Sequence, residues 1–282
     1  MRSSTLTPLQ KLGIIAGGGN LPEKLVAACD KKGIEVFIIA IEGHTEPQVY
    51  SGRHYMMTRL GAGGQMIETL RAHDIKDIVL IGGVRRPSLM EMKPDMWTAK
   101  FFAKVGLKSF GDNGILTALD NALRDEGFTV HGVQDFVHDL LAPAGLIGKH
   151  KPEKENHADI ERGLLIAREL GSLDVGQSVI IQEGLVLGVE GVEGTDELIR
   201  RCSAYKRKGQ GGILVKACKP QQDRNLDLPT IGPQTVITCI EAGLAGIVIE
   251  AGQSLLLEPE KVAELADMNK IFVLSVEPGK TL

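Results

Sequence analysis

Residues 219–233, KPQQDRNLDLPTIGP, contain a lysine, an arginine, two aspartates and a threonine, side chains that can bind ligands or assist catalysis. Prolines at three positions stiffen the backbone, and the stretch follows the apolar run 213–219. A stiff polar loop after a buried strand is a suitable platform for a functional site. Its carboxylates, Asp223 and Asp227, are the kind of ligand that Mg²⁺ prefers, and a carboxylate can also accept a proton from an attacking water.

The spacing of the two aspartates limits what they can do together. They are four residues apart, and Pro229 argues against a helix at this place. In extended backbone they would lie ~13 Å apart at about 3.3 Å per residue, too far to share one metal unless the loop folds back. At most one of them is therefore expected to be the central group. As an alternative, Asp227 only caps the turn before Leu228.

A second acidic stretch, residues 189–197, has the sequence VEGVEGTDE. Glu190 or Glu193 could supply a carboxylate to a metal ion. The stretch is also typical of a turn followed by a helix, with Thr195 or Asp196 as the N-cap.

Two glycine turns follow apolar runs in the first half of the chain. Glycine lets a ligand approach the backbone closely, and a helix N-terminus offers N–H groups and partial positive charge to a phosphate. Arginine next to such a turn can make forked contacts with phosphate. Tight turns and solvated arginines are the alternative interpretation. The candidate substrate-binding residues in these turns are Gly17, Gly18, Gly19, Asn20, Gly82, Gly83 and Arg85.

The first turn matches only part of the dinucleotide fingerprint G-x-G-x-x-G. Gly17 and Gly19 agree with it, Pro22 replaces the third glycine, and Glu42 could act as the ribose-binding acid. An NAD(P)-dependent oxidoreductase is therefore one alternative function. A non-catalytic sugar-nucleotide-binding protein is another.

The elements that must position these residues follow from the apolar pattern. In the first half, strands are predicted at 12–17, 35–41, 77–83 and 129–137, and helices at 21–32, 65–73, 95–105 and 112–126. Apolar runs without polar alternation, separated by helices, indicate a parallel sheet covered on both faces. We therefore predict an α/β protein with a Rossmann-like parallel-sheet N-terminal domain over residues 1–142.

A second α/β domain is predicted over residues 143–282. Residues 141–154, rich in proline, glycine and lysine, are expected to form the linker. Strands are predicted within 177–191, bent around Gly184, and at 213–219, 246–252 and 272–276. Helices are predicted at 157–170, 234–242 and 259–268. The pattern does not determine the strand order of this domain.

Composition limits the class of protein. The chain has 282 residues, 43% of them apolar, and a formal net charge of −4, which suits roughly two globular domains and gives no global attraction for nucleic acid. Its apolar runs are far shorter than the ~20 residues of a spanning helix. The four cysteines form no CxxC spacing, so reduced thiols in a cytoplasmic protein are expected.

Three stretches resemble the LpxI family of UDP-2,3-diacylglucosamine pyrophosphatases. They are KLGIIAGGGNLP (11–22), GLVLGVEGVEGTD (184–196) and the polar stretch 219–233. The resemblance covers about residues 11 to 278 in the right order and spacing. It implies hydrolysis of UDP-2,3-diacylglucosamine to UMP and 2,3-diacylglucosamine 1-phosphate (lipid X), a step of lipid A biosynthesis. It also implies that residues 143–282 form the family's own type of catalytic and lipid-binding domain.

The resemblance assigns roles to individual residues. The family's critical aspartate falls on Asp227, and Asp223 matches a position that is acidic in the family; we expect both to be catalytic. The family requires a divalent cation, usually Mg²⁺, and Asp227 either holds this metal or deprotonates the attacking water. Lys219 and Arg224 are expected to offset charge on the phosphoryl oxygens. Thr230 is expected to add a hydroxyl contact.

The substrate's acyl chains must also be sheltered, because exposing them costs about 0.8 kcal/mol for each CH₂. We therefore predict an apolar crevice, mainly in the second domain. The expected partner is the lipid-linked sugar nucleotide and not nucleic acid. Peripheral contact with the inner membrane surface and a homodimer are both compatible with this interpretation.

Overall fold

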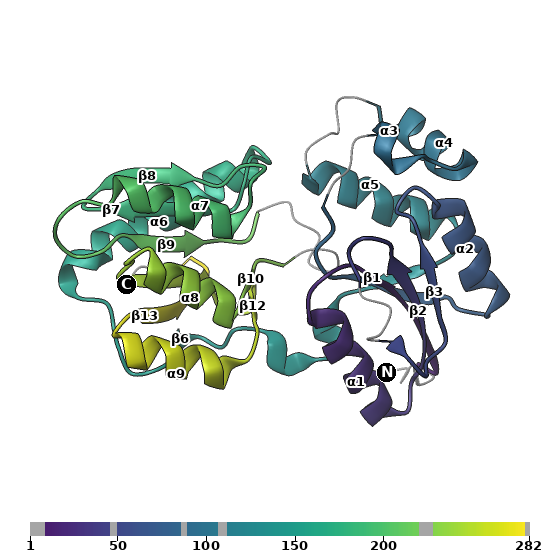
Figure 1. The fold of residues 1–282 in the computed structure, drawn as a ribbon, viewed down its shortest axis with the longest axis horizontal. Helices are drawn as coiled ribbons and strands as arrows, with labels where there is room; N and C mark the ends of the chain where they lie inside the picture. Colours follow the sequence, from purple (N-terminus) through teal and green to yellow (C-terminus); the bar gives the residue numbers. More distant parts are fainter. Residues whose placement is uncertain (1–8, 46–49, 86–88, 107–111, 220–227, 280–282) are drawn as a thin grey trace, which may run out of the picture. The chain divides into compact units, whose positions relative to one another are not determined.

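The computed structural model describes residues 9–45, 50–85, 89–106, 112–219 and 228–279. The chain divides into two compact units, an N-terminal unit (Met1–His138) and a C-terminal unit (Asp139–Leu282). The sequence had placed this division after residue 142. Each unit has its own sheet and helices (Figure 1), so the predicted α/β class is confirmed.

The N-terminal unit contains a parallel sheet of order β3-β2-β1-β4-β5. Its strands are β1 (Lys11–Ala16), β2 (Glu35–Ile41), β3 (Tyr55–Thr58), β4 (Asp77–Ile81) and β5 (Thr129–His131). The chain moves outward from β1 to β3 and then returns to the other side of β1 with β4. Open parallel sheets bind ligands at such a reversal, beyond the carboxyl ends of the strands.

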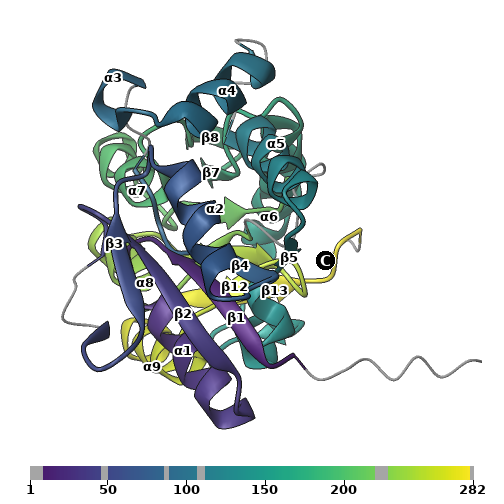
Figure 2. The same ribbon diagram turned by 90° about the vertical axis from the view of Figure 1, so that its right-hand side faces the viewer.

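Helices cover both faces of this sheet, with α1 and α2 on opposite faces (Figures 1 and 2). The helices are α1 (Leu21–Lys32), α2 (Gly63–Ala72), α3 (Leu89–Met92), α4 (Met96–Val105) and α5 (Asp112–Asp125). Helix α1 has a proline in its first turn and ends at Gly33, which adopts a left-handed conformation with φ of 68°. Proline near the start and glycine just past the end are favourable at these places, so the predicted helix is confirmed.

Two predictions for this unit were incomplete. Strand β3 has only four residues, Tyr55–Thr58, and was not predicted. The strand predicted at 129–137 ends at His131, and the chain continues as the 3₁₀ turns η3 (Val133–Asp135) and η4 (His138–Leu140). Short strands give too few apolar positions for a periodic signal.

The C-terminal unit contains a mixed sheet of order β6-β13-β11-β9-β7-β8. Strands β9, β11 and β13 are parallel, whereas β6, β7 and β8 run antiparallel to their neighbours. The strands are β6 (Gly145–Leu146), β7 (Ser178–Gln182), β8 (Leu185–Val189), β9 (Ile213–Lys216), β11 (Gly246–Glu250) and β13 (Phe272–Val276). A separate short pair joins β10 (Thr230–Ile231) to β12 (Leu255–Leu256). Because β6 pairs with β13, the segment predicted as a linker is instead part of this unit.

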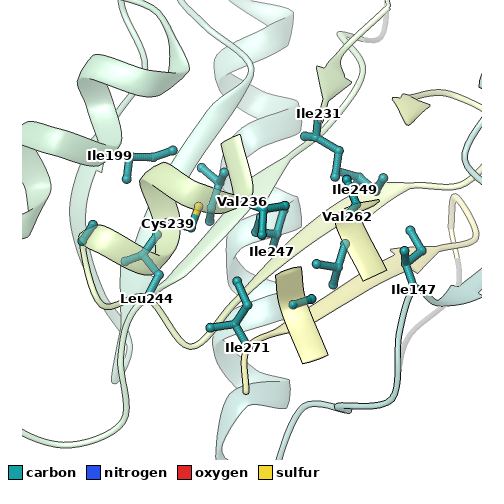
Figure 3. Packing of buried hydrophobic residues seen from close by; sticks show 14 of the residues in the cluster. Ile147, Ile199, Ile231, Val236, Cys239, Leu244, Ile247, Ile249, Val262 and Ile271 are labelled. Atoms are coloured by element: carbon teal, nitrogen blue, oxygen red, sulfur yellow. The ribbon is translucent and has the colours of Figure 1, made fainter. Parts of the chain in front are cut away.

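Two apolar cores lie on the two faces of the larger sheet. Ile213 and Val215 pack with Ile160 and Leu164 of α6, whereas the Leu214 face packs against α7, α8 and α9. Figure 3 shows part of the second core, including Ile199, Val236 and Val262. The helices are α6 (Lys154–Ser172), α7 (Thr195–Cys202), α8 (Pro233–Glu241) and α9 (Pro259–Asn269), with the 3₁₀ turn η5 (Ser203–Tyr205) after α7. Since side chains alternate along a strand, Lys216 lies on the same face of β9 as Leu214.

Helix α6 is amphipathic. In α6, Ile160, Leu164 and Ala167 are buried while the opposite side is charged. Within the described part of the chain, no helix combines the length and the apolar character needed to cross a bilayer.

Candidate functional site

Three loops meet at the carboxyl ends of β1, β2 and β4 in the N-terminal unit, and those after β1 and β4 are joined through their backbones. Gly18 N donates to Gly83 O at 2.8 Å, and Gly83 N donates to Gly18 O at 2.9 Å. Gly17 N donates to Ile81 O at 2.8 Å. The loops are residues 17–20, 42–45 and 82–85, here called the glycine-loop cluster.

Glycine is required in this cluster because the loops approach each other closely. A Cβ at Gly17 would lie 2.7 Å from Gly83 O and 2.8 Å from Gly82 O. Gly82 has φ of 97°, and a Cβ there would lie 2.7 Å from Gly18 O. The contact between loops therefore explains these glycines without a ligand.

The loop after β2 completes the cluster. Thr45 Oγ1 donates to Ala16 O at 2.9 Å, and Arg85 N donates to His44 Nε2 at 2.9 Å. The backbone N–H of Arg85 is thus held by His44, whereas Arg85 as a residue is exposed. Because the N–H groups of Gly17, Gly18 and Gly83 are used inside the cluster, a phosphate would have to meet other donors, such as the Arg85 guanidinium.

A buried polar cluster lies at the carboxyl end of β9 in the C-terminal unit. Lys216 is 7% exposed, and its Nζ donates to Thr195 Oγ1 at 2.8 Å. Thr195 Oγ1 donates to Glu190 Oε1 at 2.7 Å, and Glu190 Oε2 accepts from Gln177 N at 3.2 Å. Ser178 Oγ lies 3.4 Å from Thr195 Oγ1. Ser178, Glu190, Thr195 and Lys216 are here called the Lys216 cluster.

Charged groups also meet on the α6 side of the same sheet edge. Glu250, which ends β11 and is 3% exposed, accepts from Arg168 Nε at 2.9 Å and from Cys218 N at 2.8 Å. Lys219, expected to face phosphoryl oxygens, donates from Nζ to Asp174 Oδ1 at 2.7 Å. The Lys219 side chain is 7% exposed, so its charge is compensated inside the fold.

Several predicted site residues fall in the segment 220–227. Asp223, Arg224 and Asp227 lie outside the described residues, and their roles stay predictions. Lys219 directly precedes this segment. Thr230 lies just after it in β10, with Oγ1 donating to Leu228 O at 3.0 Å.

The two glutamates considered as metal ligands already have partners. Glu190 accepts two hydrogen bonds in the Lys216 cluster, and Glu193 Oε1 accepts from Arg201 Nη2 at 2.8 Å. The residues after them start helix α7, whose N-cap is Gly194; Thr195 is the first helical residue instead of the cap.

The described residues do not test the predicted metal site. Among them, no group of three or more His, Cys, Asp or Glu side chains is arranged to hold a metal ion. The buried carboxylate of Glu250 is likewise taken by Arg168 and a backbone N–H. The predicted metal ligand, Asp227, lies outside the described residues, so its role as a ligand stays a prediction.

A surface hollow of about 570 Å³ lies beside α6 and the β7–β8 turn. Its lining includes Glu155, Asp159, Glu161, Arg162 and Glu183. Its other lining residues are Ala158, Leu165 and Gly184, and the predicted apolar crevice stays a prediction.

The fold and the two polar sheet edges place the chain in the class of two-domain α/β proteins, whose ligands are expected at the carboxyl ends of parallel strands. Residues 11–140 match the LpxI N-terminal domain, and residues 143–274 match the LpxI C-terminal domain. The chain is also 36% identical over 279 residues to the UDP-2,3-diacylglucosamine pyrophosphatase LpxI of Caulobacter vibrioides, covering 96% of this chain and 99% of that protein. The chain belongs to the LpxI family, as its sequence motifs predicted.

Similarity to solved structures is weak. The Bordetella bronchiseptica enzyme WbmG in complex with NAD gives a TM-score of 0.30 at 15% identity, over 44% of this chain and 37% of that chain. The biotin carboxylase domain of Hydrogenobacter thermophilus 2-oxoglutarate carboxylase gives 0.28 at 13% identity, over 69% and 40%. Neither likeness supports an argument about function, and the family match does not favour the NAD(P)-dependent alternative.

Sequence reasoning missed four polar residues at the edge of the C-terminal sheet: Arg168, Thr195, Lys216 and Glu250. A signal for two of them was present, because a charged residue ends each of the apolar strands ILVK and GIVIE. Such a residue at the carboxyl end of a parallel strand is a site candidate.

Proposed function

We propose that this protein is a metal-dependent hydrolase that splits UDP-2,3-diacylglucosamine into UMP and 2,3-diacylglucosamine 1-phosphate. The observation that supports this most is the 36% identity to a relative named for that activity, spanning both units of the chain. Because 99% of the relative is covered, the proposal extends to the whole protein and not to one domain.

In the N-terminal unit, we assign substrate binding to the glycine-loop cluster. Support comes from its place between β1 and β4, where the strand order reverses. Arg85 is exposed beside it and could contact phosphate oxygens through two N–H groups.

In the C-terminal unit, we assign the chemistry to residues 220–227 and their flanks. Water attacks the phosphorus that bears the sugar, its proton passes to a carboxylate, and the bond to the UMP oxygen breaks. Asp227, with Asp223 nearby in sequence, would accept this proton or hold Mg²⁺, which when bound would neutralise charge on the diphosphate oxygens. Arg224 and Thr230 would bind those oxygens, and Lys219 could join them only by exchanging Asp174 for phosphate.

The test is incubation of the purified full chain with UDP-2,3-diacylglucosamine, with Mg²⁺ and after chelation, while UMP release is measured. Asp227→Asn should lower turnover about 10²–10⁴-fold if Asp227 is the proton acceptor. Asp125→Asn is the matched control, because Asp125 forms an exposed ion pair with Lys104 and its side chain is 72% exposed. A folded Asp227→Asn protein with normal turnover would remove Asp227 from the mechanism, and no UMP release by the wild type would reject the function.

The substrate's acyl chains give a reason for peripheral contact with a membrane surface, and we place the protein on the cytoplasmic side. A membrane-bound fraction should appear when the protein is sedimented with vesicles that contain the lipid substrate. Absence of the protein from the vesicle pellet would argue against this contact. Light scattering of the purified protein without vesicles would show whether the chain is a dimer.

A further inference from the structure

Lys216 has an unusual environment for a lysine. It ends β9, the strand between β7 and β11, and only 7% of the residue is exposed. Its ammonium donates to a hydroxyl, Thr195 Oγ1, and no carboxylate among the described residues lies within 4.0 Å of it. A buried cation normally has a directly bonded anion, because desolvation is otherwise expensive.

Lys219 provides a comparison on the same sheet edge. Its side chain is equally buried, but its ammonium contacts the Asp174 carboxylate at 2.7 Å. The fold thus pairs Lys219 directly with a carboxylate, whereas Lys216 is linked to the Glu190 carboxylate only through the Thr195 hydroxyl.

The remaining groups of the Lys216 cluster fix the direction of that hydroxyl. Thr195 Oγ1 donates its proton to Glu190 Oε1 at 2.7 Å, so its lone pair faces the ammonium. Glu190 is itself held by Gln177 N. An ammonium carries three N–H donors, and Thr195 accepts one of them. Among the described residues, no side chain or carbonyl is seen to accept the other two.

We propose that Lys216, positioned by Thr195 and Glu190, binds a phosphate oxygen of the diphosphate ligand. This inference rests on the proposed function for the identity of the ligand. It is supported by the location of Lys216 at the carboxyl end of a parallel strand, where α/β proteins bind ligands.

The test compares Lys216→Met with Lys261→Met in the full chain. Lys261 forms an exposed ion pair with Glu264, so its variant loses the same charge outside the cluster. Calorimetry with inorganic pyrophosphate should show a dissociation constant raised about 10- to 100-fold by Lys216→Met and unchanged by Lys261→Met, as expected for loss of a charge-assisted hydrogen bond. The KM for the lipid-linked substrate should rise with it.

Thr195 variants test the positioning role. Thr195→Ser keeps the hydroxyl and should bind pyrophosphate like the wild type, whereas Thr195→Val should weaken binding several-fold. If Lys216→Met does not fold, Lys216→Met combined with Glu190→Gln removes both buried charges and takes its place. A purely structural cluster would alter stability in urea but leave the dissociation constant and KM unchanged.

The inference is overturned if folded Lys216→Met binds pyrophosphate as tightly as the wild type, or if the wild type does not bind it. The proposed function fails separately, when the wild type releases no UMP from UDP-2,3-diacylglucosamine. In that case the pyrophosphate comparison still decides whether Lys216 binds an anion.

Discussion

Replacing Gly17 by alanine should destabilise the N-terminal unit by about 2–4 kcal/mol. The new Cβ would lie 2.7 Å from Gly83 O, 2.8 Å from Gly82 O and 2.8 Å from a methyl carbon of Val84. Overpacking of this kind costs about 1–3 kcal/mol. Moving the loops apart would also weaken the two hydrogen bonds between Gly18 and Gly83, each worth about 1 kcal/mol.

The chain offers a matched control in Gly83→Ala. A Cβ at Gly83 meets no atom within 4 Å, and its φ is not in the left-handed region, so its stability should change by less than about 0.5 kcal/mol. Urea unfolding can be followed by the fluorescence of Trp97, the single tryptophan, which lies in α4 of the N-terminal unit. With a slope of about 2 kcal/mol per M urea, Gly17→Ala should lower the midpoint by about 1–2 M. Equal midpoints for the two variants would refute the role given to the loop contact.

Two further predictions concern titrating groups. Hydrogen bonds from the indole N–H of Trp97, and next from the guanidinium of Arg71, lower the pKa of Glu126. The ionised carboxylate therefore stabilises the fold above its unfolded pKa of about 4.3. This stability is lost as pH falls through the folded pKa. Trp97→Phe should therefore lose about 1–2 kcal/mol at pH 7 and less at pH 3, measured by circular dichroism in urea; an equal loss at both pH values would contradict the assignment. Burial raises the pKa of the Cys29 thiol to about 11 and that of Cys239 as well, and all four cysteines are buried. Native thiols should react with Ellman's reagent at pH 8 about 10²-fold more slowly than in guanidinium, and one fast native thiol would show that a cysteine is accessible.

Much of the architecture was readable from local patterns. Strands such as β2 and β11 are uninterrupted apolar runs, and α1 has proline in its first turn and glycine at its end. The predicted turn at Gly184 was also confirmed, since Glu183 and Gly184 both have positive φ between β7 and β8. These features depend on neighbours in the chain, so composition and periodicity suffice to find them.

The sequence by itself therefore determined the α/β class, the Rossmann-like first unit and the family. Tertiary structure alone decided which polar groups meet. The backbones of Gly18 and Gly83 hydrogen-bond to each other although 65 positions separate them in the sequence. Lys216 likewise donates to Thr195, which lies 21 positions away. In each sheet, the strand order brings loops that are distant in sequence to the same edge. Lys219 resembles a phosphate ligand in sequence, but its carboxylate partner, Asp174, lies 45 residues away. Whether a buried charge is compensated depends on such long-range pairs, and local spacing contains no information about them.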